Sequence, residues 1–204
     1  KIEILSGLMR LRQICDTPKL FMDDYDGESG KLESLRELLE QIQGGNHRVL
    51  IFSQFRGMLD IIEEELGQMG LESFKITGST LAKDRQEMTK AFNQGERSAF
   101  LISLKAGGVG LNLTGANTVI LVDLWWNPAV EAQAIGRAHR IGQERNVEVY
   151  RMITRGTIEE KIQELQETKR NLVSTILDGA ESRSSLSMEE IREILGISSE
   201  SLEK

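Results

Sequence analysis

The stretch SAFLISLKAGGVGLNLTGANTVILVD (98–123) decides the fold class. Apolar residues fill its two ends, 98–103 and 118–123, without the alternation of a half-exposed strand, and this pattern predicts strands that are buried on both faces. Three other segments are predicted strands: RVLIFS (48–53), ESFKI (72–76) and NVEVYRMIT (146–154). The sequence therefore predicts five strands.

Helical patterns separate these strands. An amphipathic helix is predicted over 56–69, a second runs from a cap at Thr80 to about Asn93, and a third begins at Asn127 and Pro128 and covers 128–143. Strands that alternate with helices are joined by crossover connections, so the sequence predicts an α/β fold with a parallel sheet and helices on both faces. The order of the strands is left open.

Helices without strands flank the predicted sheet. Residues 2–15 predict a helix, and Thr157 with Glu160 predicts a capping box that opens a long helix to about Leu177. The predicted organisation is lead-in helices with an acidic linker (1–43), the sheet lobe (44–155), a long helix (156–180), and a short last helix with a frayed tail (181–204). The apolar face of the first helix is expected to comprise Ile4, Leu8, Leu11 and Cys15.

Composition excludes several protein classes. Of 204 residues, 39% are hydrophobic and 28% are charged, which rules out collagen-like, disulfide-rich and disordered chains. The single cysteine, Cys15, permits no internal disulfide and favours a reducing compartment. No apolar run is long enough to span a membrane, no signal peptide is expected, and a chain that starts with Lys1 is expected to be a fragment. The net charge of −7 argues against bulk affinity for nucleic acid, although local charge can outweigh it.

Two common nucleotide and metal motifs are missing. The sequence has no GxxxxGK[ST] phosphate loop and no Asp-Glu pair at the end of a strand that could hold magnesium. Asp123 ends a predicted strand, but without a phosphate loop it is interpreted as a structural cap or a link to the helix arginines. His47 and His139 form no ligand set with other residues, so no metal site is predicted.

The glycine-rich segment 105–113 fits no dinucleotide fingerprint, because Leu113 stands where G-x-G-x-x-G requires its third glycine. Its backbone amides, together with Ser103, Lys105 and Asn112, could clasp phosphate oxygens. A tight turn at the end of a strand explains the glycines equally well. Both interpretations stay open.

The helix predicted over 128–143 carries the strongest chemical signal. Gln133, Arg137 and Arg140 follow one another at spacings of four and three, which places them on one helical face. Gly136 lies beside the arginines and costs about 1 kcal/mol of helix stability relative to alanine, which suggests a close approach to the backbone. The two arginines suit a polyphosphate, and a surface salt-bridge cluster is the alternative.

Two adjacent tryptophans, Trp125 and Trp126, follow the predicted strand 118–123. In parallel sheets, ligands bind beyond the carboxyl ends of the strands, so either ring could face DNA there. Tandem tryptophans more often belong to the core, and that interpretation also stays open.

The order of four segments resembles one family. The segments are VLIFSQF, FKITGST, FLISLKAGGVGLNLTGANTVILVDLWWNP and QAIGRAHRIGQ, and the chain is similar over roughly residues 5–180 to the second RecA-like lobe of Swi/Snf-type ATPases of helicase superfamily two. The stretch TIEEKIQELQETKRNLVSTIL looks like the brace helix of that family. The family often has R-L-D-G where this chain has KITG (75–78), and Lys75 can still contact a phosphate as a point charge.

The resemblance implies a division of labour between two lobes. ATP and magnesium bind between the lobes and DNA runs over both, with the phosphate loop in lobe one. Arg140 matches the arginine finger and Arg137 its companion, and these two with Gln133 and Gly136 form the implied nucleotide-binding set. The positions implied to face DNA are Ser53, Gln54, Lys75, Ser79, Ser103, Lys105, Gly107, Gly108 and Trp126.

These features together predict the second motor lobe of an ATP-dependent translocase on double-stranded DNA. The isolated lobe is expected to be a monomer, to bind no nucleotide tightly and to hydrolyse no ATP. Its expected partners are lobe one of the same polypeptide, DNA and a DNA-bound protein complex, inside a cell and more in keeping with a bacterial enzyme than a chromatin remodeller. A strand-separating helicase lobe, a non-catalytic interaction module and a nucleotide-binding oxidoreductase are the alternatives.

Overall fold

The computed structural model describes residues 2–104, 110–140, 143, 145–175 and 187–196. Its centre is a five-stranded parallel sheet in the order β2-β3-β1-β4-β5. The strands are β1 (Val49–Ser53), β2 (Ser73–Ile76), β3 (Ala99–Ser103), β4 (Thr118–Leu121) and β5 (Glu148–Arg151). The predicted parallel α/β fold is therefore confirmed, and the structure adds the strand order.

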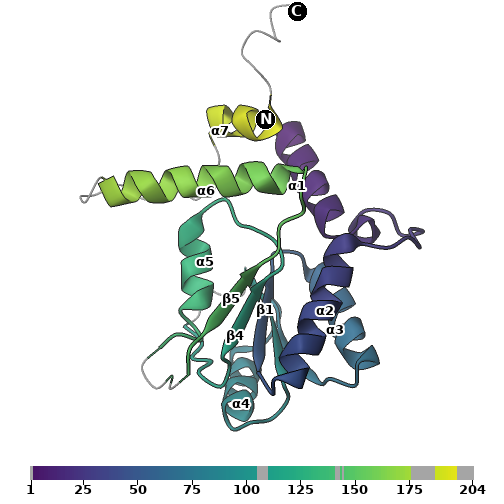
Figure 1. Ribbon diagram of the computed structural model, residues 1–204, viewed down its shortest axis with the longest axis vertical. Coiled ribbons are helices and arrows are strands. Elements are labelled where there is room, and N and C mark those ends of the chain that lie inside the picture. Colours follow the sequence, from purple (N-terminus) through teal and green to yellow (C-terminus); the bar gives the residue numbers. More distant parts are fainter. Residues whose placement is uncertain (1, 105–109, 141–142, 144, 176–186, 197–204) are drawn as a thin grey trace, which may run out of the picture.

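Helices account for most of the remaining described residues (Figure 1). Those of the sheet lobe and its lead-in are α1 (Ile2–Asp16), a short 3-10 turn (Pro18–Leu20), α2 (Gly30–Gly44), α3 (Arg56–Gln68), α4 (Ala82–Asn93) and α5 (Pro128–Ile135). Two more follow the sheet: α6 (Ile158–Thr175) and α7 (Met188–Leu195). Two helices begin at residues that are typical N-caps. The Ser29 hydroxyl accepts from Leu32 N at 3.3 Å at the start of α2, and Asn127 caps α5 with Pro128 in its first turn.

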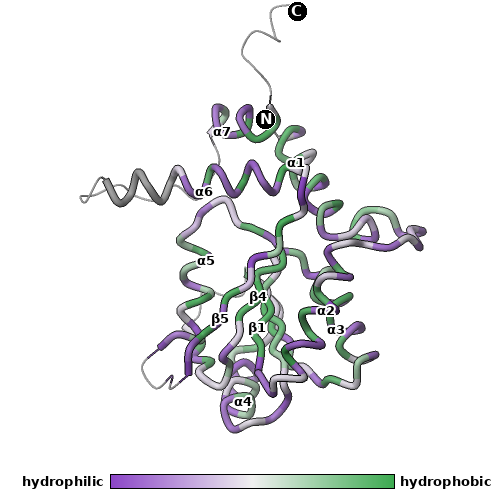
Figure 2. The backbone as a smooth tube through the Cα atoms, viewed as in Figure 1, coloured by the Kyte–Doolittle hydropathy of each residue, from purple (hydrophilic) through white to green (hydrophobic). Residues whose placement is uncertain are grey.

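The strands separate two apolar layers, and Figure 2 shows the central strands β1 and β4 largely in the hydrophobic green. Alternate residues of β1 point to opposite faces, as the pleat requires. Ile51 packs with α2 and α3, whereas Leu50 packs with α4 and α5. All five residues of β1 are buried, which explains why its sequence does not alternate.

A third cluster joins the flanking helices to the sheet. Leu8 of α1, Ile162 of α6 and Ile191 of α7 pack around Leu124, which follows β4. Figure 1 shows α6 lying across one end of the sheet, next to α1 and α7. The brace-like helix therefore covers the end of the lobe where the loops after β1 and β4 emerge.

Three local expectations are wrong. The helix predicted over 128–143 ends at Ile135, because Gly136 is its C-cap and turns follow. Thr80 does not cap α4, since Leu81 holds that position and the Thr80 hydroxyl accepts instead from Thr77 N at 3.0 Å.

The third concerns the start of α6. The Thr157 hydroxyl does cap the helix, because it accepts from Glu159 N at 3.2 Å. Glu160, however, accepts from Gly156 N at 3.0 Å, one residue before the position that a capping box requires. The box is found instead in α7, where Ser187 and Glu190 cap each other.

The apolar face expected for the first helix is also only partly buried. Leu8 is 1% exposed, but Ile4 and Leu11 are 39% and 41% exposed. Two charged residues, Arg12 and Asp16, are buried in their place. Among the described helices, none combines the length and apolarity that a membrane span requires.

Candidate functional site

The loops after β1 and β4 meet at the carboxyl edge of the sheet, and Asp123 joins them. Its carboxylate accepts hydrogen bonds from the Ser53 hydroxyl and from the Gln54 backbone N–H, the latter at 3.0 Å. The Gln54 side-chain amide donates to the Leu124 carbonyl at 2.6 Å. Asp123 therefore caps the loop after β1, which is the structural role that one interpretation of the sequence proposed.

A buried cation balances Asp123. Arg12 of α1 lies 4.0 Å from the Asp123 carboxylate and donates a hydrogen bond to the Leu124 carbonyl. Burial raises the pKa of Asp123, while the charge of Arg12 and the Ser53 hydrogen bond lower it. Arg12 belongs to a segment more than 100 residues away in sequence, so sequence spacing gave no signal for this contact.

A second buried charge cluster lies beside the first. The Lys31 ammonium contacts Asp16 at 2.8 Å and Glu159 at 2.6 Å, and it donates to the Val122 carbonyl at 2.9 Å. This cluster ties α1, α2 and the start of α6 to the residue just before Asp123. The sequence analysis missed it, because isolated charges on separate helices do not indicate burial.

Glu131 of α5 anchors the loop of the two tryptophans. It is fully buried and accepts from Trp125 N at 3.1 Å and from the Gln166 amide of α6 at 2.6 Å. Arg151 of β5 pairs with its other oxygen at 3.2 Å. The brace-like helix therefore holds the tryptophan loop through a polar contact as well as through the apolar cluster.

Trp126 is half-buried and packs against the cluster around Leu124. The Arg12 guanidinium lies over its ring, 4.4 Å from the ring centroid. The core interpretation therefore holds for the packed part of the ring, and contact of its exposed surface with DNA stays a prediction.

A pocket of about 500 Å³ opens at the same edge of the sheet. It is lined by three of the residues predicted to face DNA, Gln54, Ser79 and Ser103. These residues come from the loops after β1 and β2 and from the end of β3. The structure thus brings together positions that are distant in sequence. Ser53 was also predicted to face DNA, but it is buried and its hydroxyl donates to Asp123.

Lys75 lies on the other side of β2 from the core residues Phe74 and Ile76. Its ammonium pairs with two carboxylates of α3, Asp60 at 2.8 Å and Glu63. Burial lowers the pKa of Lys75, but hydrogen bonds to these carboxylates outweigh it and the net pKa is raised. A phosphate would have to compete with two carboxylates for this cation.

The arginines occupy a turn after α5, which we call the arginine turn (136–140). Backbone hydrogen bonds from Arg137 to Ala134 and from Ala138 to Ile135 form it. Arg137 is 5% exposed, whereas Arg140 and Gln133 are exposed. The three side chains therefore do not share one helical face, and Gly136 serves to end the helix.

The arginine turn is docked on the segment that leads into β4. The Arg137 carbonyl accepts from Leu113 N at 3.0 Å, and the Gln143 amide donates to the carbonyls of Thr114 and Ala116 at 3.1 and 2.7 Å. Gln143 is the last residue of the segment QAIGRAHRIGQ, and these hydrogen bonds hold the arginine turn against the segment before β4.

The exposed Arg140 lies near the glycine-rich segment. A Cβ atom added at Gly110 would stand 3.8 Å from its guanidinium. Burial and then the charge of Arg140 lower the pKa of Arg137, so the two cations are close enough to interact. Two neighbouring guanidinium groups with one of them exposed can bind a polyphosphate, which would relieve their repulsion.

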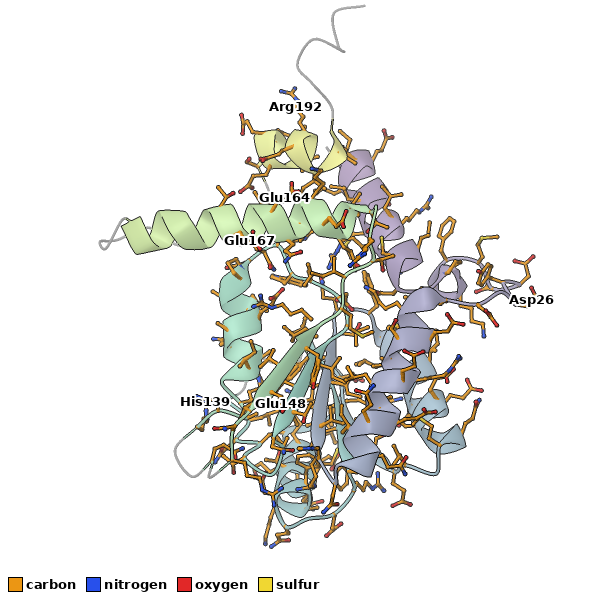
Figure 3. All side chains as sticks on the ribbon, in the orientation of Figure 1. Asp26, His139, Glu148, Glu164, Glu167 and Arg192 are labelled. Carbon is orange, nitrogen blue, oxygen red and sulfur yellow. The ribbon has the colours of Figure 1, made fainter. Side chains whose placement is uncertain are left out.

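In Figure 3 the labelled His139 of the arginine turn lies well away from α6, where Glu164 and Glu167 are labelled. Lys105, Gly107 and Gly108 lie outside the described residues.

The described residues offer no metal site. The His47 ring forms a hydrogen bond with the Asn117 side chain at 2.6 Å, and in the part of the chain that the structure describes no cluster of His, Cys, Asp or Glu could hold a metal ion.

Comparison with protein families identifies the lobe. Residues 30–142 match the model described as the helicase conserved C-terminal domain. The chain belongs to this family. Its relatives and structural neighbours are Swi/Snf-type ATPases, so the resemblance of the sequence to that group is confirmed.

Two relatives illustrate the range of the group. The chain is 44% identical over 204 residues to the "Putative ATP-dependent helicase/translocase YwqA" of Bacillus subtilis, covering 97% of this chain and 22% of that protein. It is 42% identical over 190 residues to the mouse SWI/SNF-related matrix-associated actin-dependent regulator of chromatin subfamily A member 1, covering 87% and 18%. The chain thus spans about a fifth of the length of these relatives.

Solved structures agree on the fold. The Sulfolobus solfataricus SWI2/SNF2 ATPase core in complex with double-stranded DNA is 36% identical with a TM-score of 0.74, over 94% of this chain and 41% of that one. The C-terminal part of the Fun30 ATPase domain is 33% identical with a TM-score of 0.65, over 89% and 56%. The helicase C-terminal lobe described here is therefore RecA-like.

Proposed function

We propose that this lobe is the second motor lobe of an ATP-dependent translocase on double-stranded DNA. The lobe supplies an arginine finger to the nucleotide and part of the DNA groove. The observation that carries the proposal is the pairing of an exposed Arg140 with a buried Arg137 on a turn that Leu113 and Gln143 hold in place. Membership of a family of helicases and translocases supplies the reaction class.

The donor set fits the phosphates of a nucleotide and does not fit its metal. Cations and backbone amides bind phosphate oxygens, whereas magnesium requires carboxylates or waters in octahedral geometry. The lobe lacks a phosphate loop and a magnesium-binding acid pair in its sequence. A first lobe would therefore hold ATP and magnesium, and this lobe alone would hydrolyse nothing.

Arg140 acts on the transferring phosphoryl group when the two lobes close. Phosphoryl transfer depends on positioning and on neutralisation of charge, and an inserted arginine is worth about 10³–10⁵ in rate. The planar guanidinium offers two parallel N–H donors, which lysine cannot reproduce. Arg137, which is buried beside it, orients the turn and adds positive potential.

The DNA contacts are proposed for the pocket edge. Gln54, Ser79 and Ser103 line it, Trp126 stands nearby on the loop after β4, and Lys75, Lys105, Gly107 and Gly108 complete the proposed set. Hydroxyl, amide and backbone N–H groups contact the phosphates of a duplex without reading its sequence. A motor that moves along DNA of any sequence needs such contacts, and we place it inside a cell, as a monomer that acts on a DNA-bound protein complex.

The decisive experiment is Arg140→Ala in a polypeptide that contains this lobe together with a first lobe. DNA-stimulated hydrolysis is expected to fall about 10³-fold or more, while ATP affinity changes by a few-fold at most. Arg140→Lys should rescue little of the rate. Arg155→Ala, which removes an exposed arginine outside the arginine turn, is the matched control.

Two results would count against the proposal. Near-normal stimulated turnover in Arg140→Ala would remove the finger assignment. A large drop in melting temperature would make Arg140 a structural residue. Arg137→Ala cannot serve as the main test, because that side chain is buried and its loss affects the fold as well as the rate.

A further inference from the structure

Arg12 is the one buried arginine of α1 in the described structure, and its environment is unusual for that helix. Its side chain is 1% exposed, although the adjacent Leu11 is 41% exposed. Burial lowers the pKa of Arg12, while the charges of Asp123 and Asp16 raise it, and arginine stays protonated throughout. Arg12 thus occupies a buried position of α1 where an apolar side chain, such as that of Leu8, would pack without a cost for burying charge.

The contacts of Arg12 show what the charge does there. Its guanidinium donates to the Leu124 carbonyl and lies 4.0 Å from the Asp123 carboxylate. The guanidinium carbon lies 4.4 Å from the centroid of the Trp126 ring and 5.5 Å from the centroid of the Phe55 ring. A single side chain of α1 thus touches the loop after β1 and the loop after β4.

We propose that Arg12 is the positioning residue of the DNA-facing edge. It fixes the plane of the Trp126 ring and the separation of the two loops, so that the placement of α1 sets the geometry of Gln54 and Trp126. The proposal rests on the proposed function for the role of these two residues in DNA binding. Its structural part, the control of Trp126 by Arg12, does not depend on DNA.

The chemistry of the side chain explains why it is an arginine. A planar guanidinium can donate in its plane to a carbonyl and a carboxylate while its face covers an aromatic ring. Lysine keeps the charge but has no flat face to stack on Trp126. Methionine fills a similar volume and keeps neither interaction. These two replacements therefore separate the charge from the ring contact.

The test uses the fluorescence of Trp126. The chain has two tryptophans, so Trp125→Phe leaves Trp126 as the single emitter. In this background, Arg12→Met is expected to raise quenching by acrylamide by roughly twofold and to weaken binding to a short DNA duplex by about three- to tenfold. Arg10→Met is the matched control, since Arg10 is an exposed arginine of the same helix that lies over Phe21.

Stability is controlled separately. Leu39→Ala removes a buried side chain of α2 that lies near Val49 and Ala99, where β1 and β3 begin. It should lower the melting temperature without changing the quenching of Trp126. Arg12→Lys should fold, still expose the ring and lose part of the DNA affinity, because it keeps the charge but not the ring contact. It carries the test if Arg12→Met does not fold.

The outcomes are distinct. Unchanged quenching of Trp126 in folded Arg12→Met or Arg12→Lys overturns the proposal. The proposal also fails if Leu39→Ala loses as much DNA affinity as the Arg12 variants for the same drop in melting temperature. Absence of DNA binding by the unchanged chain would overturn the proposed function instead, and the quenching data would still decide the role of Arg12.

Discussion

The carboxyl edge of the sheet and the arginine turn are built in different ways. At the carboxyl edge, the residues that hold the loops come from distant helices, as in the contacts of Arg12 with Leu124 and of Lys31 with Val122. The arginine turn is held by backbone hydrogen bonds to the end of α5 and to the segment before β4, and Arg140 remains exposed. Buried charges therefore hold the loops of the edge together, whereas the turn presents a charge to solvent.

This difference predicts where substitutions will act. Buried charges that pair with each other are costly to separate, because each loses its partner in a region without water. Exposed charges on a turn cost little when they are removed. Changes at the edge should therefore affect folding first, whereas changes at Arg140 should affect the reaction with little effect on folding.

The largest effect on stability is expected for Lys31→Met. This change leaves Asp16 and Glu159 buried without their shared cation, and breaking such a pair costs about 3–5 kcal/mol. Urea unfolding of the purified lobe measures the loss. Lys83→Met, which changes an exposed lysine that pairs only with Glu87, should cost about 0–0.5 kcal/mol.

Arg140→Met completes the comparison, with an expected cost of about 0.5 kcal/mol or less. Equal losses in Lys31→Met and Arg140→Met would show that the two regions contribute alike to stability. The buried charges of the edge would then not stabilise the fold more than the arginine turn does, even if Arg140 proved essential for hydrolysis.

A smaller loss is expected for Ser53→Ala. The hydroxyl donates to the buried Asp123 carboxylate, and removal of one donor to a buried charged acceptor costs about 1–3 kcal/mol. Ser79→Ala is the matched control, because this exposed hydroxyl pairs only with that of Thr77 and its loss should cost about 0.5 kcal/mol or less. Thermal melting of both variants measures the difference, and equal shifts would contradict the buried role of Ser53.

Asp16 should make the stability of the lobe depend on pH. Burial raises the pKa of Asp16 well above its ordinary value of 3.8, and Asp123 raises it further, against the charge of Lys31. The folded state therefore binds this proton more tightly than the unfolded chain does. Stability from this source is greatest below pH 3.8 and decreases as the pH rises toward the folded pKa.

Asp16→Asn removes this dependence. The difference in unfolding free energy between the unchanged lobe and Asp16→Asn should decrease as the pH rises above about 4 and then become constant. Urea midpoints across this range measure it, with the exposed Asp23→Asn as the control. If the unfolding free energies of the unchanged lobe and of Asp16→Asn change in parallel with pH, Asp16 does not carry the proton.

The sequence predicted β1 and β3 within one residue of their observed starts, because both strands are simple apolar runs. It failed where packing outweighed local pattern. On α1 the apolar stripe predicted Leu11 as buried, whereas the fold buries Arg12, whose partners Asp123 and Leu124 lie more than 100 residues away. The spacing of apolar residues can indicate a helix, but it cannot show that a charged residue such as Arg12 is buried beside a carboxylate that is distant in sequence.

The candidate site divides in the same way. The arginines were identified from a short motif, but their common helical face was wrong, because a glycine ends α5 before Arg137. The pocket that gathers Gln54, Ser79 and Ser103 required the strand order, which the sequence did not provide. Motifs thus located the chemistry, and long-range contacts determined its geometry.

The smallest effect is expected for Lys75→Ala. A free lysine that contacts one phosphate adds about 0.9 to the log–log salt slope of DNA binding. Lys75 already pairs with Asp60 and Glu63, so its removal should change the slope by about 0.3 or less. Titration of a fluorescent duplex at several salt concentrations measures the slope.

Neutralising the two carboxylates should reverse this result. Asp60→Asn with Glu63→Gln releases the Lys75 ammonium, so the slope should steepen by about 0.9 and affinity should rise. Asp23→Asn with Asp24→Asn makes the same change in net charge in the linker and controls for long-range attraction. Lys75→Ala added to the first pair should abolish the gain. If the gain persists without Lys75, the duplex does not contact this strand, and the DNA-facing surface is limited to the pocket edge and the loop of Trp126.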